Sequence, residues 1–273
     1  MPELPEVETL CRGLERHLQG RSIVRVDVLE PRLRSPVEPA LPGRLQDRII
    51  VRVGRRAKYI LIFLENKTVW VFHLGMSGKL IHVDAATPVK KHDHIVATLD
   101  NGRELRYHDP RRFGLSVVVP EARLDQLPQL RRLGFDPFDS RFDGPHLRSF
   151  TRRSARRIRD LLLDQQVVAG IGNIYANEIL FRVGVRPTRR ACRLPRHKVE
   201  QIAAMIPKVL REAIRWCGTS FSDYRDADDN FGEFQKRLRV YDRKGEKCRR
   251  CPSVIKRIAL GNRSAFYCPA CQA

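Results

Sequence analysis

Short runs of apolar and β-branched residues fill the first part of the chain. They are IIVRV at 49–53, YILIFL at 59–64, TVWVF at 68–72, HIVATL at 94–99 and LSVVV at 115–119, and Gly, Asn and Asp residues separate them. Runs of this length between turn residues are typical of β-strands. We predict an antiparallel β-sandwich in this region.

Apolar residues three and four positions apart predict helices elsewhere. One such stripe opens the chain before Gly20 and is formed by Leu4, Val7, Leu10, Cys11, Leu14 and Leu18. After about Pro120 the helical period returns around 158–162, 174–180 and 202–214, and Pro207 is able to kink the last helix. The fold class is therefore α+β, with the opening helix packed against a sheet.

Changes in this pattern divide the chain into four parts. The sandwich occupies 1–120, a linker rich in Pro and Gly spans 121–145, a helical domain covers 146–240, and a short Cys-rich segment follows at 241–273. We expect a cleft where the linker joins the two larger domains. One substrate in one cleft favours a monomer.

The charge balance narrows the choice of partner. The chain has 52 Lys and Arg against 31 Asp and Glu, a formal net charge of +21 with a pI of about 10.4. A positive charge of this size indicates an anionic partner, and nucleic acid is the commonest one. Arginine far outnumbers lysine, which suits phosphate binding but also follows from a GC-rich genome. An anionic membrane surface is the main rival partner.

No membrane span or secretion signal is evident. No run approaches the roughly 18 consecutive apolar residues that a spanning helix needs. The start, MPELPEVETL, carries acids and prolines where a signal peptide carries a basic and then an apolar run. We expect a soluble cytoplasmic protein that does not bind membranes.

Four of the seven cysteines form a pattern with metal-ligand spacing. Two Cys-x2-Cys pairs stand sixteen residues apart: Cys248, Cys251, Cys268 and Cys271. This spacing is typical of a tetrahedral structural zinc site, in which four thiolates leave no position open for water. Disulfides, free thiols or an iron–sulfur centre are the alternatives. The segment between the pairs presents a basic tip that includes Arg263.

The amino terminus has its own chemistry. Removal of Met1 would leave Pro2 as a secondary amine beside Glu3 and Glu6. A terminal amine titrates at roughly pH 7.7 to 8.0, so part of it is nucleophilic in the cell, and a secondary amine can form an iminium with a sugar aldehyde. The alternative is an ordinary helix start, where Pro and acids are common.

Seven blocks of the chain, taken in order, resemble the formamidopyrimidine-DNA glycosylase family. They are PELPEVE at the start, GRRAKYILIFL around Lys58, HLGMSG around Met76, KHDH around His92, DPRRFG at 109–114, DQQVVAGIGNIYANEILF at 164–181, and NRSAFYCPAC in the Cys-rich segment. The resemblance implies a sandwich, a helix-two-turn-helix domain and a zinc finger. It also implies a bacterial enzyme that acts on nucleoid DNA.

The resemblance implies a role for several residues. Pro2 would attack C1′ of an oxidised purine nucleotide, Glu3 would move protons at the sugar, and Glu6 would orient this end of the chain. Lys58 and Arg263 would assist β- and δ-elimination. The residues expected to contact DNA or fill the space of the extruded base are Met76, His92, Arg111, Phe113, Arg153 and Asn173. Without the resemblance, core packing would explain Met76 and Phe113, helix capping would explain Asn173, and an exposed surface would explain His92 and Arg153. Lys58 would be a solvated lysine at a strand edge. The arginine cluster would form the basic face of one helix: Arg152, Arg153, Arg156, Arg157 and Arg159.

Two stretches depart from the family pattern. Arg159 stands where a lysine is expected, which keeps the charge and changes the geometry. The stretch 218–234 matches the length of a loop that covers the extruded base, but it is unusually acidic, so substrate range is open. The alternatives are an endonuclease VIII-like glycosylase for oxidised pyrimidines and a non-catalytic, zinc-containing DNA-binding module.

Overall fold

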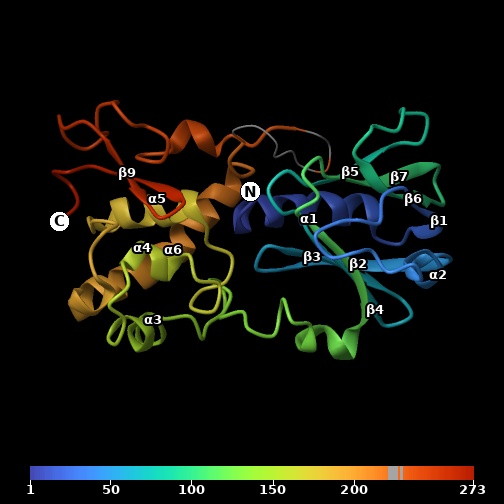
Figure 1. Ribbon diagram of the computed structural model, residues 1–273, viewed down its shortest axis with the longest axis horizontal. Helices are drawn as coiled ribbons and strands as arrows, with labels where there is room; N and C mark the ends of the chain where they lie inside the picture. Colours follow the sequence, from blue (N-terminus) through green and yellow to red (C-terminus); the bar gives the residue numbers. More distant parts are fainter. Residues whose placement is uncertain (221–226, 228–229) are drawn as a thin grey trace. The chain divides into compact units, whose positions relative to one another are not determined.

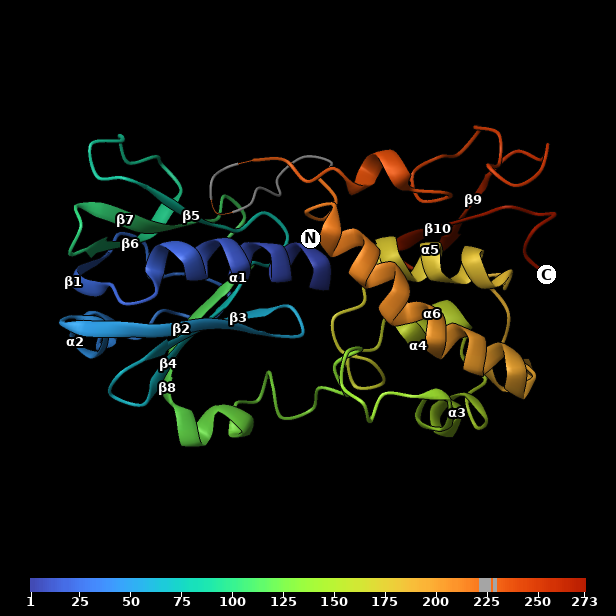
Figure 2. The same cartoon turned by 180° about the vertical axis from the view of Figure 1, so that it is seen from behind.

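A computed structural model describes residues 1–220, 227 and 230–273. The chain forms two compact units, one made of 1–131 with 216–235 and the other of 132–215 with 236–273 (Figures 1 and 2). These units differ from the predicted domains, because the stretch after the last long helix belongs with the sandwich. Residues 221–226 and 228–229 of the predicted base-covering loop lie outside the described residues.

The first unit contains eight antiparallel strands in the order β5-β7-β6-β1-β2-β3-β4-β8. The strands are β1 Ser22–Val28, β2 Arg48–Arg56, β3 Tyr59–Leu64, β4 Thr68–His73, β5 Lys79–Asp84, β6 Asp93–Leu99, β7 Arg103–His108 and β8 Leu115–Pro120. The short pairing of β1 with β2 joins two four-stranded layers. The predicted antiparallel sandwich is confirmed, and β1, β5 and β7 are strands that the pattern did not reveal.

Helices cover the sandwich. In Figures 1 and 2, α1 (Leu4–Leu18) runs between the layer that ends in β5 and the layer that contains β2 and β3. The predicted apolar stripe of α1 is buried in the sandwich core, together with α2 (Leu41–Leu45). On the other face of β3 and β4, residues around the 3-10 helix η1 (Glu121–Gln126) pack against a second apolar cluster. Strand β3 is thus buried on both faces, which explains its unbroken apolar run.

The second unit is mainly helical. Its elements are α3 Gly144–Thr151, α4 Ile158–Leu162, α5 Asn173–Val183, η2 Ala191–Arg193, α6 Arg196–Arg215 and the hairpin β9 Lys256–Leu260 with β10 Arg263–Tyr267, and η3 Phe234–Arg237 lies at its border. Helix α5 packs against α6 and β10, and α6 stays helical across Pro207. Within the described part of the chain, no helix combines the length and apolar character of a membrane span.

Candidate active site

The first turn of α1 holds the amino-terminal end of the chain in place. Pro2, Glu3 and Glu6 are buried. The Glu6 carboxylate accepts the backbone N–H of Glu3 at 2.8 Å and that of Thr219 at 2.7 Å. The first bond is half of a capping box, in which an acid in the first turn reaches back to the residue before the helix. Glu6 therefore fixes the backbone next to Pro2 and ties it to the start of the 218–234 loop.

The two ends of this loop are joined to each other. Gly218 accepts the N–H of Phe234 at 2.9 Å, and the Ser220 hydroxyl accepts that of Gly232 at 2.9 Å. Gly218 has a φ of +77°, and a Cβ there would lie 2.9 Å from the Glu6 carboxylate. The close approach to Glu6 therefore requires glycine at this position.

Lys58 lies in a two-residue turn between β2 and β3. The preceding residue, Ala57, has a φ of +53°, an unfavourable conformation for alanine that turns the chain sharply. The Lys58 side chain is only 6% exposed, so it is not a solvated strand-edge lysine. Burial, together with the charges of Lys58 and Arg34, lowers the pKa of His73 to about 4. His73 is thus neutral at pH 7, and its Nδ1 accepts the N–H of Gly75 at 3.0 Å.

A buried carboxylate links the turn that carries Met76 to the 109–114 segment. Asp109 is fully buried and accepts hydrogen bonds from the Ser77 hydroxyl at 2.7 Å, the Tyr107 hydroxyl at 3.2 Å and the Gly114 N–H at 2.9 Å. No role for Asp109 was predicted from the sequence. Its position, directly after a strand and before Pro110 in the DPRRFG block, could have indicated a structural role.

Met76, Arg111 and Phe113 are brought together at the surface. A Cβ on Gly75 would lie 2.7 Å from the backbone of Phe113, so the two turns are in direct contact. Met76 is 43% and Phe113 44% exposed, and the Arg111 guanidinium lies 4.7 Å from the Phe113 ring centroid. Burial of Met76 and Phe113 in the sandwich, the alternative interpretation, is wrong. Exposed apolar side chains on rigid turns are suited to entering a base stack.

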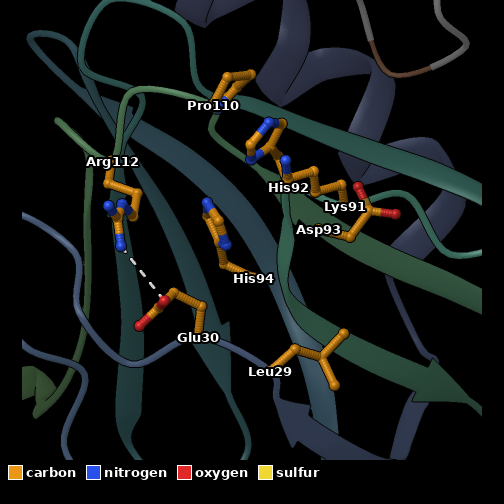
Figure 3. A pocket seen from close by; sticks show the side chains of 8 residues that line it. All are labelled: Leu29, Glu30, Lys91, His92, Asp93, His94, Pro110 and Arg112. Atoms are coloured by element: carbon orange, nitrogen blue, oxygen red, sulfur yellow. Dashed lines mark hydrogen bonds and ion pairs between the residues drawn. The ribbon is translucent and has the colours of Figure 1, made fainter.

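His92 lines a pocket next to this segment. Figure 3 shows the pocket, which is lined by Leu29, Glu30, Lys91, His92, Asp93, His94, Pro110 and Arg112. The backbone oxygen of His92 accepts the N–H of Asp109, which places the pocket beside the segment that carries Arg111. Desolvation, and then the nearby charge of His108, lower the pKa of His92. Arg112 forms an ion pair with Glu30 across the pocket at 3.3 Å.

In the second unit, Arg159 organises the predicted phosphate-binding residue Asn173. Arg159 is only 1% exposed, and its Nη2 donates to Oδ1 of Asn173 at 2.7 Å. Asn173 in turn donates to the backbone oxygen of Ser264 at 3.0 Å, one residue after Arg263 on β10. Gly172 caps α5, so the Asn173 side chain does not act as the cap. Asn173 and the Arg263 hairpin are thus held together.

Arg153 lies in an irregular, arginine-rich segment at 152–157 after α3. Arg152, Arg153, Arg156 and Arg157 are exposed, whereas Arg159 is buried. The alternative interpretation of these residues as the basic face of one helix is wrong, because α3 ends at Thr151 and α4 begins at Ile158.

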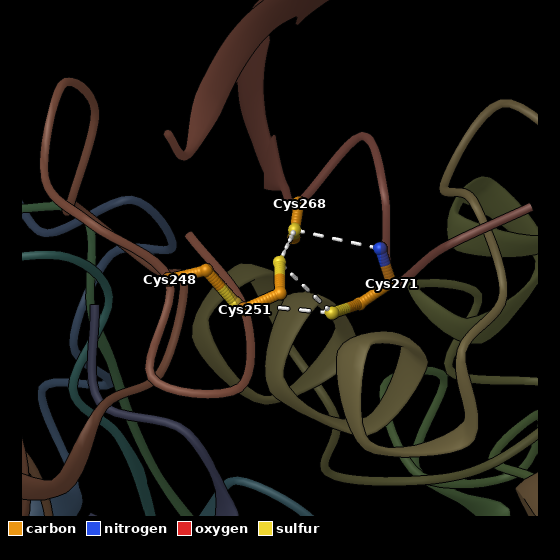
Figure 4. Close-up of side chains that lie close together, drawn as sticks. All are labelled: Cys248, Cys251, Cys268 and Cys271. Atoms are coloured by element: carbon orange, nitrogen blue, oxygen red, sulfur yellow. Dashed lines mark hydrogen bonds between the residues drawn. The ribbon is translucent and has the colours of Figure 1, made fainter. Parts of the chain in front are cut away.

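The four cysteines of the two pairs converge on one point (Figure 4). Their sulfurs all lie within 4.8 Å of one another, with 3.5 Å between Cys251 and Cys268 and 3.9 Å between Cys248 and Cys271. Sulfurs placed tetrahedrally at 2.3 Å from a zinc ion would be about 3.8 Å apart, whereas bonded sulfurs are about 2.0 Å apart. The cluster fits one structural zinc and excludes the disulfide alternative.

A second buried carboxylate anchors this zinc finger. Its role was not predicted from the sequence. Glu178 on α5 is fully buried and accepts the N–H groups of Arg239, Val240 and Tyr241 at 2.9 to 3.0 Å. Desolvation raises the pKa of Glu178 even though these three donors oppose the shift. A single acidic residue within an apolar helical segment was the feature of the sequence that could have indicated this role.

Family models match nearly the whole chain. The formamidopyrimidine-DNA glycosylase N-terminal domain matches residues 1–116, its H2TH domain matches 133–225, and a zinc finger found in FPG and IleRS matches 245–273. The zinc-finger match also argues against an iron–sulfur centre.

Relatives and solved structures agree with these models. The chain is 47% identical to the formamidopyrimidine-DNA glycosylase of Thioalkalivibrio sulfidiphilus and 43% identical to that of Hahella chejuensis, with 100% of each chain covered. A Lactococcus lactis Fpg in complex with DNA containing an abasic site has a TM-score of 0.92 at 31% identity, covering 99% of both chains. MutM (FPG) from Thermus thermophilus has a TM-score of 0.90 at 36% identity, covering 99% of this chain and 98% of that one. The chain belongs to the formamidopyrimidine-DNA glycosylase family.

Proposed function

We propose that this protein removes oxidised purines, such as 8-oxoguanine and formamidopyrimidines, from duplex DNA and then cleaves the strand at the abasic site. The observation that carries the proposal is the buried Pro2–Glu3 end, which Glu6 holds by a hydrogen bond to the Glu3 backbone. Structures in the family contain DNA with an abasic site or a benzylated Fapy-dG lesion.

The chemistry would begin at the free amine of Pro2 after loss of Met1. The nitrogen attacks C1′ of the damaged nucleotide, the bond from C1′ to the base breaks, and the base leaves with a proton. The sugar ring opens to an iminium, and Glu3 supplies and accepts protons at the sugar. Loss of a C2′ proton sends electrons toward the iminium, and the 3′ C–O bond breaks with release of the 3′ phosphate in β-elimination. Loss of a second proton, from C4′, then breaks the 5′ C–O bond and releases the 5′ phosphate in δ-elimination.

The other candidate residues would position the DNA. Lys58 would lie at the phosphates as a proton donor for β-elimination, and Arg263 would hold the phosphate and assist δ-elimination. Met76, Arg111 and Phe113 would fill the space left by the extruded base, and the fork of Arg111 is able to read the opposite base. Asn173 would bind the phosphate of the lesion, and His92 and Arg153 would contact the DNA. The zinc site would hold the Arg263 hairpin and take no part in the chemistry.

We expect a monomer to suffice and place the activity in the bacterial cytoplasm, on nucleoid DNA. The acidic composition of the 218–234 loop leaves lesion preference to be measured.

Borohydride trapping tests this function. The protein is incubated with duplexes that contain 8-oxoguanine or an oxidised pyrimidine, and a covalent adduct is measured after reduction. We expect an adduct mainly with the oxidised purine, and none in a form that retains Met1, because the amine of Pro2 is then an amide. Preference for the pyrimidine would favour the endonuclease VIII-like alternative. Absence of any adduct would favour a non-catalytic DNA-binding module.

A further inference from the structure

Two paired segments of the second unit carry exposed arginines. Segment 153–157 and segment 189–193 are joined by backbone hydrogen bonds, including Ala191 N–H to Arg156 at 2.8 Å and Cys192 N–H to Ser154 at 2.9 Å. Together they carry six exposed arginines, of which Arg156 is paired with Asp164 at 2.8 Å. The other five are called the arginine strip here: Arg153, Arg157, Arg189, Arg190 and Arg193.

The positive charge of the arginine strip is poorly compensated. Arg157 and Arg190 are direct partners in an antiparallel bridge, an arrangement in which like charges destabilise the pairing. Arg157 has one carboxylate partner, the half-buried Asp160, at 3.9 Å. Among the described residues, the other four arginines form no ion pair with a carboxylate. An anionic ligand along the strip would relieve this repulsion.

The strip adjoins the residues expected to hold the lesion phosphates. Arg157 directly precedes α4, and Arg159 in the first turn of α4 donates to the Asn173 side chain. Arg157, two positions before Arg159, therefore connects the segment that holds Asn173 to the bridge with Arg190. A repeating anion such as a nucleic-acid backbone fits several neighbouring guanidinium groups, because each can bind a phosphate through two donors.

We propose that the arginine strip, through Arg189, Arg190 and Arg193, binds the backbone of the duplex that flanks the lesion. This inference rests on the proposed function and extends the DNA contact beyond Arg153 and Asn173. The strip would lengthen the bound stretch of DNA and add affinity without sequence preference, since phosphate contacts carry no base information.

The test compares DNA binding by two charge-matched triple variants with that of the unchanged protein. One combines Arg189→Gln, Arg190→Gln and Arg193→Gln, and the control combines Arg16→Gln, Arg123→Gln and Lys208→Gln. The three control residues are exposed, and none forms an ion pair with a described carboxylate. Each protein is titrated at several salt concentrations with duplexes of about one and about three helical turns that carry an unreactive abasic analogue.

On the long duplex, we expect the strip variant to bind more weakly and its log–log salt slope to fall by about one for each arginine that contacts a phosphate. The control should match the unchanged protein. On the short duplex, the strip variant and the control should bind alike. Equal slopes for the two variants on the long duplex would overturn the inference, as would an equal loss on both duplexes. Because the analogue needs no chemistry, failure of the strip is distinct from failure of trapping.

Discussion

At the scale of single residues, the Glu6 carboxylate holds two backbone segments at once, those of Glu3 and Thr219. We predict that Glu6→Gln slows base excision about tenfold to a hundredfold in single-turnover assays. The amide has one acceptor oxygen, so one buried N–H loses its partner at a cost of roughly 1–3 kcal/mol.

Glu15→Gln on the same helix serves as the control for the Glu6 substitution, because no buried donor depends on Glu15 among the described residues. The prediction fails if Glu6→Gln excises at the unchanged rate, or if its melting temperature falls enough to account for the loss.

His73 should make folding stability depend on pH. The pKa of His73 is lowered to about 4 in the folded protein, from an ordinary value of about 6.5. The unfolded chain therefore takes up a proton as the pH falls through 6.5, while the folded chain does not until near 4. The stabilisation is present above pH 6.5 and is lost toward pH 4, by up to roughly 3 kcal/mol.

Denaturant titration between about pH 7 and about pH 4 checks this expectation. In His73→Asn, the amide oxygen can still accept the Gly75 N–H but does not titrate, so the pH dependence should be weaker than in the unchanged protein. If the free energy of unfolding depended on pH equally in the two proteins, the lowered pKa of His73 would be contradicted.

Residue identities were more predictable than residue environments. The blocks around Lys58 and Met76 could be named from sequence, and their candidate roles followed from the resemblance. Lys58 is buried next to a positive-φ turn at Ala57, a conformation that an alanine does not indicate. The contact between the turn that carries Met76 and the Phe113 segment is held by Asp109, which bonds Ser77 from 32 positions away. No local pattern therefore indicates either environment.

At the scale of elements, Arg159 joins α4, the start of α5 and the zinc hairpin. Removing its charge-assisted hydrogen bonds to Asn173 and Ser264 lowers the free energy of unfolding by roughly 1.5–3 kcal/mol and loosens the hairpin beside Arg263. We predict that Arg159→Met lowers the rate of δ-elimination about tenfold relative to β-elimination, with zinc content unchanged. Gel analysis separates the two cleaved ends.

Compared with Arg159→Met, Arg159→Lys should restore part of the δ-elimination product, since lysine keeps the charge but lacks the planar guanidinium and its paired donors. If both elimination products decline in proportion in Arg159→Met, Arg159 contributes only general stability and does not position Arg263.

The zinc hairpin offers a separate prediction. Cys268→Ser should release the zinc ion and weaken DNA binding, because metal binding and folding of such a finger are coupled. Elemental analysis measures the metal, and Cys192→Ser, an exposed cysteine outside the cluster, is the matched control. Full zinc content in Cys268→Ser would contradict a four-thiolate site.

Elements with a regular apolar pattern were predictable from the sequence, whereas strands that mix apolar and charged residues were not. The stripe of α1 and the unbroken run of β3 match the structure closely. Strands β5 (KLIHVD) and β7 (RELRYH) carry charged residues, and the buried Arg106 on β7 is held by Glu104 and by backbone oxygens at 87 and 88. Such tertiary pairing cannot be read from a local pattern.

At the scale of the whole molecule, composition indicated the class of partner before any motif did. A net charge of +21 in a chain with two compact units is consistent with binding along a polyanion. The assignment of 216–235 to the sandwich unit was not predictable, because its contacts are with residues far away in the chain, such as the bond from Thr219 to Glu6, more than 200 positions earlier.

Peptide mapping of the borohydride-reduced adduct with 8-oxoguanine DNA identifies the residue that forms the covalent intermediate. We expect the sugar remnant on the nitrogen of Pro2, in a chain that has lost Met1. A remnant attached to a lysine side chain such as Lys58, or a reaction that forms no adduct, would contradict this expectation.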